Sequence, residues 1–358
     1  MIEKLKYVPI FRARQQEIAL LKEFEFGEFI SPMVEIIKEK DRKNNQLSSS
    51  SIYQELINEI NADKVFLSLP TYIKISSSTH SDVITFSRKV LENIDSRISF
   101  LKQFSSLDKV IPVISSLLAK TGEINTITKQ FEALKDDFEV LAYQTFPSTF
   151  EQDFQEIQNC LREKVDVFFY DLDNVNITSP VFKKQKSKIA LINPDGNRIL
   201  CRSAINKDIQ NVTLVHEEII DDADNSLVEM YEGQGFNGFG DYVGIKKDEL
   251  TAGGTISPGF ILYDPADNLY YGFKGNLKKL EEFEITIVPA VFNSHVVKNL
   301  QEKEPQYLNN NPGFITLRAI SEEKESGKNQ AKFKKVSMGH YLHCIKTSLE
   351  EGRKIPLV

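Results

Sequence analysis

A carboxylate set among glycines, Asp241 in GFGDYVGI, is the first residue that could do chemistry. Presented on a glycine turn, it could bind a metal ion or act as a general acid or base. The structural alternative is that Asp241 caps the following turn or pairs with Arg12, while the glycines permit a tight backbone. Asp171 in YDLD could join Asp241, although an Asp-x-Asp pair is also common in turns.

Two histidines near the C-terminus form the second candidate. His340 and His343 in GHYLHCI stand three residues apart and would share one face of a helix. Their nitrogens, together with Asp241 or Asp171, could hold a metal ion. A structural pair, with one histidine in the core and one on the surface, is the favoured interpretation. We therefore assign no metal, and the sequence names no cofactor.

Several common catalytic motifs do not occur in the sequence. There is no P-loop, no G-x-G-x-x-G after a first strand, no G-x-S-x-G and no H-E-x-x-H. This removes the usual signatures of nucleotide triphosphatases, dinucleotide-binding enzymes, serine hydrolases and zinc proteases.

Eight short apolar segments bounded by turn residues are the elements that would position these side chains. They are rich in Val, Ile, Phe and Tyr, as strands buried on both faces are. The segments are YVPIFRA from Tyr7, ISPMVEII from Ile30, VFLSLP from Val65, VIPVIS from Val110, EVLAYQTF from Glu139, DVFFYDLD from Asp166, NVTLVHEEI from Asn211 and GFGDYVGI from Gly238. Segments with helical spacing lie between most of them. This alternation predicts a parallel sheet with crossover helices, and eight repeats favour a (β/α)8 TIM-like barrel.

The predicted barrel is irregular on one side. Residues 176–188 form a short basic connection, and KIALINPDGNRILCRS is typical of a hairpin that turns at Asp195-Gly196. We therefore expect a barrel over residues 1–250 with a hairpin insertion near 188–202. Loops are expected at residues 39–51 and 75–81. An α+β appendage should cover residues 251–358, with a hairpin through Pro265 to Asn268, a strand at EITIVPAVF and a terminal helix.

The C-terminal ends of barrel strands converge on the face where such proteins place their active sites. On this basis we predict three catalytic residues, namely Asp241, Asp171 and Glu35. The predicted substrate-binding residues are Arg12, Arg14 and His340. Arg12 should pair with Glu35 or Asp171, because a buried unpaired ion costs several kcal/mol. Weaker candidates at strand ends are Asp173, His216, Glu217 and Glu218.

Composition narrows the class of protein. Hydrophobic content of 41% and charged content of 27% are those of a globular protein. No apolar run approaches the roughly 20 residues that span a bilayer, so no membrane partner is expected. The net charge of −7 disfavours nucleic acid as a partner, and the lysine clusters at 183–188 and 332–335 are interpreted as solvated faces. The cysteines match no zinc or disulfide spacing, and no export signal is visible, so we expect a cytoplasmic protein.

Five motifs together resemble a known family. YVPIFRARQQEIALL, ISPMVEI, YDLD, GFGDYVGI and a terminal GHYLHCI, in this order, are similar to the "protein beta" family of bacteriophages and bacteria. The family's aromatic residue and glycine before an Asp match Phe239, Gly240 and Asp241. Phe333 stands where the family tends to have Trp, and the paired histidines are separated. The resemblance implies a bacteriophage-related or antiviral defence setting but supplies no reaction.

Two functions from different classes stay open. The favoured one is protein binding: an accessory component on a TIM-like barrel, with the charged cluster stabilising the fold and the appendage docking a partner protein. The alternative is a hydrolase-like barrel enzyme that acts on a phosphorylated or nucleic-acid-derived substrate, with Arg12 binding the anion.

Overall fold

The computed structural model describes residues 4–40, 48–72, 75, 77, 79–247 and 257–357. These residues form two compact units. The first unit contains residues 4–202 and 231–240, and the second contains residues 203–230, 241–247 and 257–357. No helix in the described part of the chain has the length and apolar character needed to cross a membrane.

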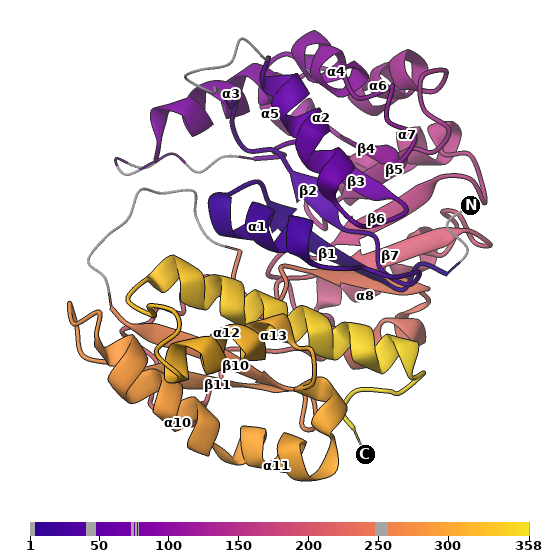
Figure 1. The fold of residues 1–358 in the computed structure, drawn as a ribbon. Coiled ribbons are helices and arrows are strands. Elements are labelled where there is room, and N and C mark those ends of the chain that lie inside the picture. The colour runs from indigo at the N-terminus through magenta and orange to yellow at the C-terminus, as the bar shows by residue number, and fades with distance from the viewer. Residues whose placement is uncertain are drawn as a thin grey trace. The chain divides into compact units, whose positions relative to one another are not determined.

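Eight strands close into a parallel barrel, which confirms the (β/α)8 prediction (Figure 1). Backbone pairing between Phe239 N and Lys6 O, at 2.9 Å, joins the last strand to the start of the first. The strands in barrel order are β1 (Tyr7–Arg12), β2 (Met33–Glu35), β3 (Val65–Ser68), β4 (Val110–Ser115), β5 (Ala142–Thr145), β6 (Val167–Asp171), β7 (Asn197–Cys201) and β9 (Gly238–Asp241).

Amphipathic helices connect these strands. Several begin with a side-chain cap: Ser48 accepts a hydrogen bond from Ser51 N, and Asn93 accepts one from Ser96 N. The helices are α1 (Gln15–Glu23), α2 (Ser49–Glu59), α3 (Ser81–Leu91), α4 (Ile94–Lys102), α5 (Leu118–Thr121), α6 (Thr126–Leu134), α7 (Phe150–Cys160) and α8 (Pro180–Ile189).

The hairpin predicted near residues 188–202 is wrong. The basic segment forms α8, which Ser179 caps and Pro180 begins, and which buries Phe182 and Ile189. The residues after Asp195-Gly196 form β7, which pairs in parallel with β6 and β9. The turn at Asp195-Gly196 is present, but it follows α8 and leads into β7, so it belongs to a helical crossover between parallel strands. Residues 197–201 pair with a strand on each side and are therefore part of the barrel.

The segment from Asn211 is also not a barrel strand. Only Glu218–Ile219 is extended there, as β8, and it pairs antiparallel with β11 (Leu269–Lys274) in the second unit. Consequently His216, Glu217 and Glu218 do not lie at a barrel strand end. The predicted boundary at residues 250 and 251 lies outside the described residues, as do residues 41–47, 73, 74, 76 and 78 of the predicted loops.

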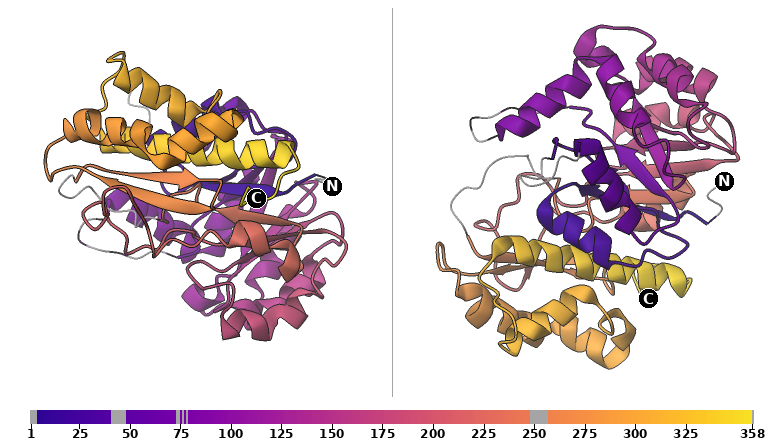
Figure 2. Two further views of the ribbon diagram at one scale, coloured as in Figure 1. Left: turned by 90° about the horizontal axis from the view of Figure 1, so that it is seen from below. Right: turned by 45° about the horizontal axis from the view of Figure 1, so that its top comes forward.

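The second unit contains a three-stranded sheet in the order β10 (Gly259–Asp264), β11, β8. Figure 2 shows the C-terminal helices on one face of β10 and β11. The predicted hairpin of β10 and β11 is formed, but the strand predicted at EITIVPAVF is wrong, because residues 283–293 are helical. The helical elements of this unit are α9 (Leu227–Met230), the π-helix η2 (Phe283–Ile287), α10 (Val288–Asn293), α11 (His295–Lys303), η3 (Pro305–Tyr307), α12 (Pro312–Ser321) and α13 (Gln330–Glu350).

Side chains of α13 bond the edge of β10 that faces away from β11. Gln330 Nε2 donates to Gly259 O at 3.1 Å, Ser337 Oγ to Ile261 O at 2.9 Å, and His340 Nε2 to Tyr263 O at 2.8 Å. These carbonyls belong to alternate residues, which point to the same edge of a strand. The helix therefore satisfies backbone acceptors that a further strand would otherwise take.

Candidate functional site

The C-terminal ends of the barrel strands bring polar side chains together in the first unit. The strand register places Arg12 opposite Glu35, Glu35 opposite Ser68, and Ser115 opposite Gln144. With Asp171 at the end of β6, these residues form the candidate site. All of them except Glu35, which is half-buried, are buried.

An ion pair joins the first two strands of this site. Arg12 Nε lies 2.9 Å from Glu35 Oε2, and the two side chains are 8% and 15% exposed. The pairing expected from the sequence is therefore present. Because water is largely excluded from this pair, removing one partner would leave the other charge without compensation.

Arg97 on α4 is a wholly buried member of the site that the sequence analysis missed. Its guanidinium donates to Pro70 O and Ser115 Oγ, each at 2.9 Å, and to Gln130 Oε1 at 3.2 Å. These acceptors are neutral, and no carboxylate of the described residues lies in ion-pair distance. Burial lowers the pKa of Arg97 to about 10, and the negative charge of Glu35 opposes this shift. Arg97 therefore stays protonated at neutral pH, and Glu35 lies in the field of two arginines.

A weak signal of this role exists in the sequence. In DSRISFLK, Arg97 occupies the same helix face as Ile94, Phe100 and Leu101, which are all buried. Spacings of three and four residues predict that a side chain on this face points into the core. An arginine at such a position must find hydrogen-bond acceptors.

Gln144 holds the carboxylate of Asp171. Its Nε2 donates to Asp171 Oδ2 at 2.9 Å, while Asp171 Oδ1 accepts from Asp173 N at 2.8 Å. Asp173 has a φ of 55°, so the YDLD motif forms a tight turn closed by its first aspartate. Asp171 is thus a buried carboxylate that accepts hydrogen bonds on both oxygens.

Asp241 has a similar arrangement within the second unit. Its Oδ1 accepts from Val243 N at 2.8 Å, and its Oδ2 accepts from the Tyr341 hydroxyl. Only 1% of Asp241 is exposed. The aspartate therefore caps the turn that follows β9, which is the structural alternative considered for this residue.

The glycines around Asp241 are needed for close packing. A Cβ on Gly240 would lie 2.8 Å from both Cys201 Sγ and Val8 O, the neighbours of β9 in the barrel. Gly244 has a φ of 65°, and a Cβ there would lie 2.6 Å from Cγ of Tyr341. These distances are shorter than a nonbonded carbon contact allows, so a side chain at either position would displace its neighbours.

The two histidines have separate partners. His340 is wholly buried: Nε2 donates to Tyr263 O, and Nδ1 accepts from Asn311 Nδ2 at 3.0 Å. Burial lowers the pKa of His340 to about 4, so the ring is neutral. His343 bonds Gln306 O through Nε2 at 3.2 Å, and burial lowers its pKa too. Among the residues that the structure describes, no group of three His, Cys, Asp or Glu side chains could hold a metal ion.

The remaining predicted substrate residue, Arg14, lies at the start of α1. Its Nε lies 3.1 Å from Glu17 Oε1, and the two side chains form an ion pair one turn apart. Of the six predicted site residues, Arg12, Glu35, Asp171 and Arg14 belong to the first unit. Asp241 and His340 belong to the second unit and bond other residues of that unit.

Comparison with known proteins identifies the family. The model of the family described as Beta protein matches residues 7–346, nearly the whole chain. The chain belongs to the Beta protein family. This confirms the resemblance drawn from the five motifs.

The other comparisons add little to this assignment. No curated protein matches the sequence of this Beta protein family member. One similar solved structure is the crystal structure of a GH18 chitinase from Pseudoalteromonas aurantia, with 15% sequence identity and a TM-score of 0.37. The similarity covers 66% of this chain and 93% of that one.

Proposed function

We propose that this Beta protein family member is a protein-binding accessory component that acts in a bacteriophage-related or antiviral defence setting. The observation that supports a binding role is the state of the candidate carboxylates. Glu35 is paired with Arg12, Asp171 accepts from Gln144 and Asp173, and Asp241 accepts from Val243 and Tyr341. Because hydrogen-bond donors of the protein itself bind these carboxylates, we infer that they stabilise the fold and do not act as catalytic groups.

The proposed setting and location have separate supports. The setting follows from the family resemblance. The net charge of −7 favours a protein partner over nucleic acid. All three cysteines are buried thiols, as is usual in a reducing compartment, so we propose a cytoplasmic location.

The binding role can be tested by affinity capture. The tagged full-length chain would be incubated with lysates of phage-infected and uninfected bacteria, and the recovered proteins quantified. We expect one partner in a fixed molar ratio, which then binds the purified chain in a reconstituted mixture. A chain that is recovered alone from both lysates, and that elutes alone from a sizing column, would contradict the proposal.

A second function is favoured by one specific observation. Buried polar side chains lie at the C-terminal ends of the barrel strands, where barrel enzymes hold their substrates. Arg12 and Arg97 place two guanidinium groups near Glu35, and such groups can bind an anion through paired hydrogen bonds. The alternative is therefore a hydrolase-like enzyme acting on a phosphorylated or nucleic-acid-derived substrate, with Arg12 contacting the anion and Glu35 or Asp171 as acid or base.

Turnover measurements separate the two functions. The purified protein would be assayed against phosphomonoesters, phosphodiesters and oligonucleotides, with and without divalent cations. If the alternative holds, Glu35→Gln or Asp171→Asn removes turnover of one substrate class and leaves substrate binding intact. Turnover that persists unchanged in both variants would remove these residues from catalysis.

A further inference from the structure

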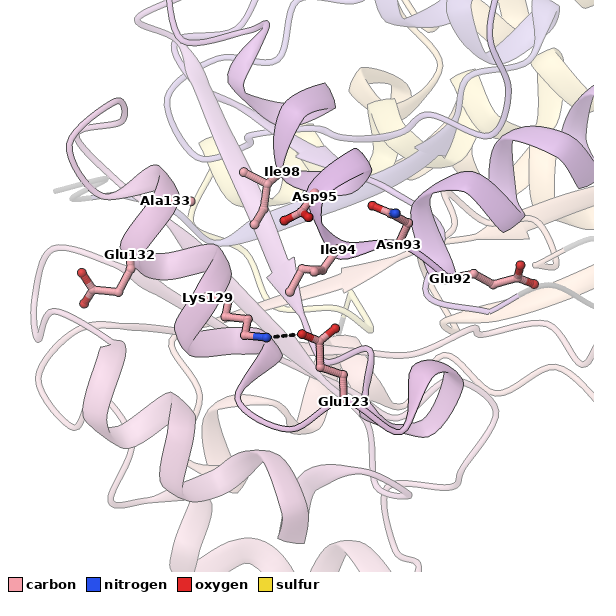
Figure 3. Close-up of a pocket in the computed structure, with 9 residues that line it drawn as sticks. All are labelled: Glu92, Asn93, Ile94, Asp95, Ile98, Glu123, Lys129, Glu132 and Ala133. Carbon is pink, nitrogen blue, oxygen red and sulfur yellow. Dashed lines mark hydrogen bonds and ion pairs between the residues drawn. The ribbon is translucent and has the colours of Figure 1, made fainter.

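A pocket of about 690 Å³ lies between α4 and α6 in the first unit (Figure 3). Its apolar lining comes from Ile94 and Ile98 on α4 and from Ala133 on α6. Ile94 packs with Leu91 and Leu117, and Ile98 lies against this small cluster and is only partly buried. The pocket thus offers apolar surface on one of its walls.

Carboxylates dominate the rest of the lining. Glu123 is paired with Lys129, as the dashed line in Figure 3 shows, and Glu132 is paired with Lys135. Glu92 and Asp95, in contrast, have no hydrogen-bond or ion-pair partner for their side chains among the described residues. In Figure 3, Glu92 and Glu132 stand at opposite ends of the group of labelled side chains. Lysines pair two of the four carboxylates in the lining, so its excess negative charge comes from Glu92 and Asp95.

Helix stability alone does not explain these acids. Asp95 lies in the first turn of α4, where a negative charge stabilises the helix. Glu92, however, is the residue that ends α3, where a negative charge is unfavourable. The charge of Glu92 therefore does not stabilise the dipole of α3.

We propose that this pocket docks a basic segment of a partner protein. An arginine or lysine of that segment would lay its aliphatic stem on Ile94 and Ile98 and place its cation beside Glu92 and Asp95. Long basic side chains combine an apolar stem with a charged tip, which matches a lining of isoleucines next to carboxylates. This inference rests on the proposed partner-binding function and names the chemistry of the partner.

Buried hydrogen bonds link the two helices that form the walls of the pocket. Arg97 on α4 bonds Gln130 on α6, and both side chains also bond Ser115 at the end of β4, through Oγ and O respectively. These three residues fix the spacing of the two helices. A preformed pocket loses less conformational entropy when a ligand binds than one that must first assemble.

The test uses the full-length chain and a labelled peptide of alternating arginine and alanine. Its counterpart, with citrulline in place of arginine, keeps the size and removes the charge. Fluorescence anisotropy at low salt should show binding of the arginine peptide and none of the citrulline peptide. The double variant Glu92→Gln/Asp95→Asn should weaken binding about fivefold or more, since exposed charge pairs each contribute modestly. Ile98→Ala should also weaken it.

A matched control separates the pocket from overall charge. Glu281→Gln/Glu302→Gln changes the net charge equally at two exposed positions of the second unit, and its affinity should stay within about twofold of wild type. The single variant Glu92→Gln guards against a loss of α4, because residue 92 precedes that helix. Circular dichroism would show that each variant is folded.

Three results would overturn the inference. The first is an equal loss of affinity in both double variants, which would indicate diffuse attraction to the whole acidic chain. The second is pocket-dependent binding of spermidine without binding of the peptide, which would assign the pocket to a small polyamine. The third is a captured stoichiometric partner that binds the pocket variants as tightly as wild type. In that case the proposed function stands and this inference alone fails.

Discussion

The hydroxyl of Tyr341 donates a hydrogen bond to Oδ2 of Asp241, a residue 100 positions earlier in the chain. The second oxygen of the same carboxylate accepts from the backbone of Val243. The bond connects the middle of α13 with the turn that follows β9, and Gly244 allows the two to approach. Asp241 thus links the turn after β9 to α13 within the second unit.

Tyr341→Phe should lower the free energy of unfolding by about 2 kcal/mol, because it leaves a buried carboxylate with one donor fewer. Urea denaturation would measure this change. Tyr307→Phe is the control, since the hydroxyl of Tyr307 bonds only the neutral Ser348 Oγ at 3.1 Å, and its loss should cost about 1 kcal/mol. Equal losses in the two variants would show that the carboxylate confers no special strength.

The buried ion pair should matter more than an exposed one. Arg12→Ala should cost about 3 kcal/mol of unfolding free energy, because Glu35 then loses its partner in a place with little water. Lys4→Ala removes an exposed pair with Glu28, with side chains 58% and 53% exposed, and should cost less than about 1 kcal/mol. A similar loss in both variants would mean that burial does not strengthen the dependence on the pair.

The neutral state of His340 should make the fold sensitive to acid. The pKa of this residue is about 4 in the folded chain and 6.5 in a model compound, so the unfolded chain binds more protons between these values. Stability should therefore fall as the pH drops from 6.5 toward 4, by up to about 3 kcal/mol from this group. His343, whose pKa burial also lowers, acts in the same direction.

His340→Gln would test this dependence, because its amide can still donate to Tyr263 O but does not titrate. The variant should lose stability at pH 7 and show a flatter decline of melting temperature between pH 6.5 and 4. His80→Gln, at an exposed histidine before α3, is the control for replacing an imidazole by an amide and should keep the melting temperature of wild type at pH 7. An unchanged slope in His340→Gln would contradict the assignment.

Two glycines with similar backbone angles provide a further contrast. Gly244 and Gly122 have φ values of 65° and 70°, but a Cβ on Gly122 would meet no atom within 4 Å. Gly122→Ala should therefore cost about 1 kcal/mol, from backbone conformation alone. Gly244→Ala should cost clearly more in thermal denaturation, since its methyl group would collide with the ring of Tyr341. The reverse order would show that the ring moves aside easily.

Much of the fold could be predicted because strands buried on both faces leave a clear pattern. Seven of the eight predicted segments contain barrel strands, from Tyr7–Arg12 to Gly238–Asp241. The missed strand, Asn197–Cys201, follows the Asp195-Gly196 turn, and such a turn between two strand-like segments is typical of a hairpin. Its true partners, β6 and β9, come from both sides of it in the sequence, and local patterns do not reveal such pairing.

The candidate site was predicted only where a strand ends in a charge. Arg12 and Glu35 could be paired in advance, because adjacent parallel strands bring their ends together. Arg97 and Gln144 were missed for different reasons. Arg97 reaches the site from a helix, and Gln144 is a neutral residue inside a strand-like run. The roles of Arg97 and Gln144 depend on which residues pack around them in three dimensions. Neither residue is a charged side chain at the end of a strand, so the rule used for Arg12 and Glu35 does not find them.

The hydrogen bonds from Gln330, Ser337 and His340 to β10 bear on how this protein can be shortened. A version that stops before residue 330 would lose far more than a peripheral helix. It would present a row of bare carbonyl groups to solvent, ready to recruit strands from neighbouring molecules. Helix α13 thus protects the edge of β10 from pairing with other molecules. If C-terminal truncations are insoluble, exposure of this edge would be the cause.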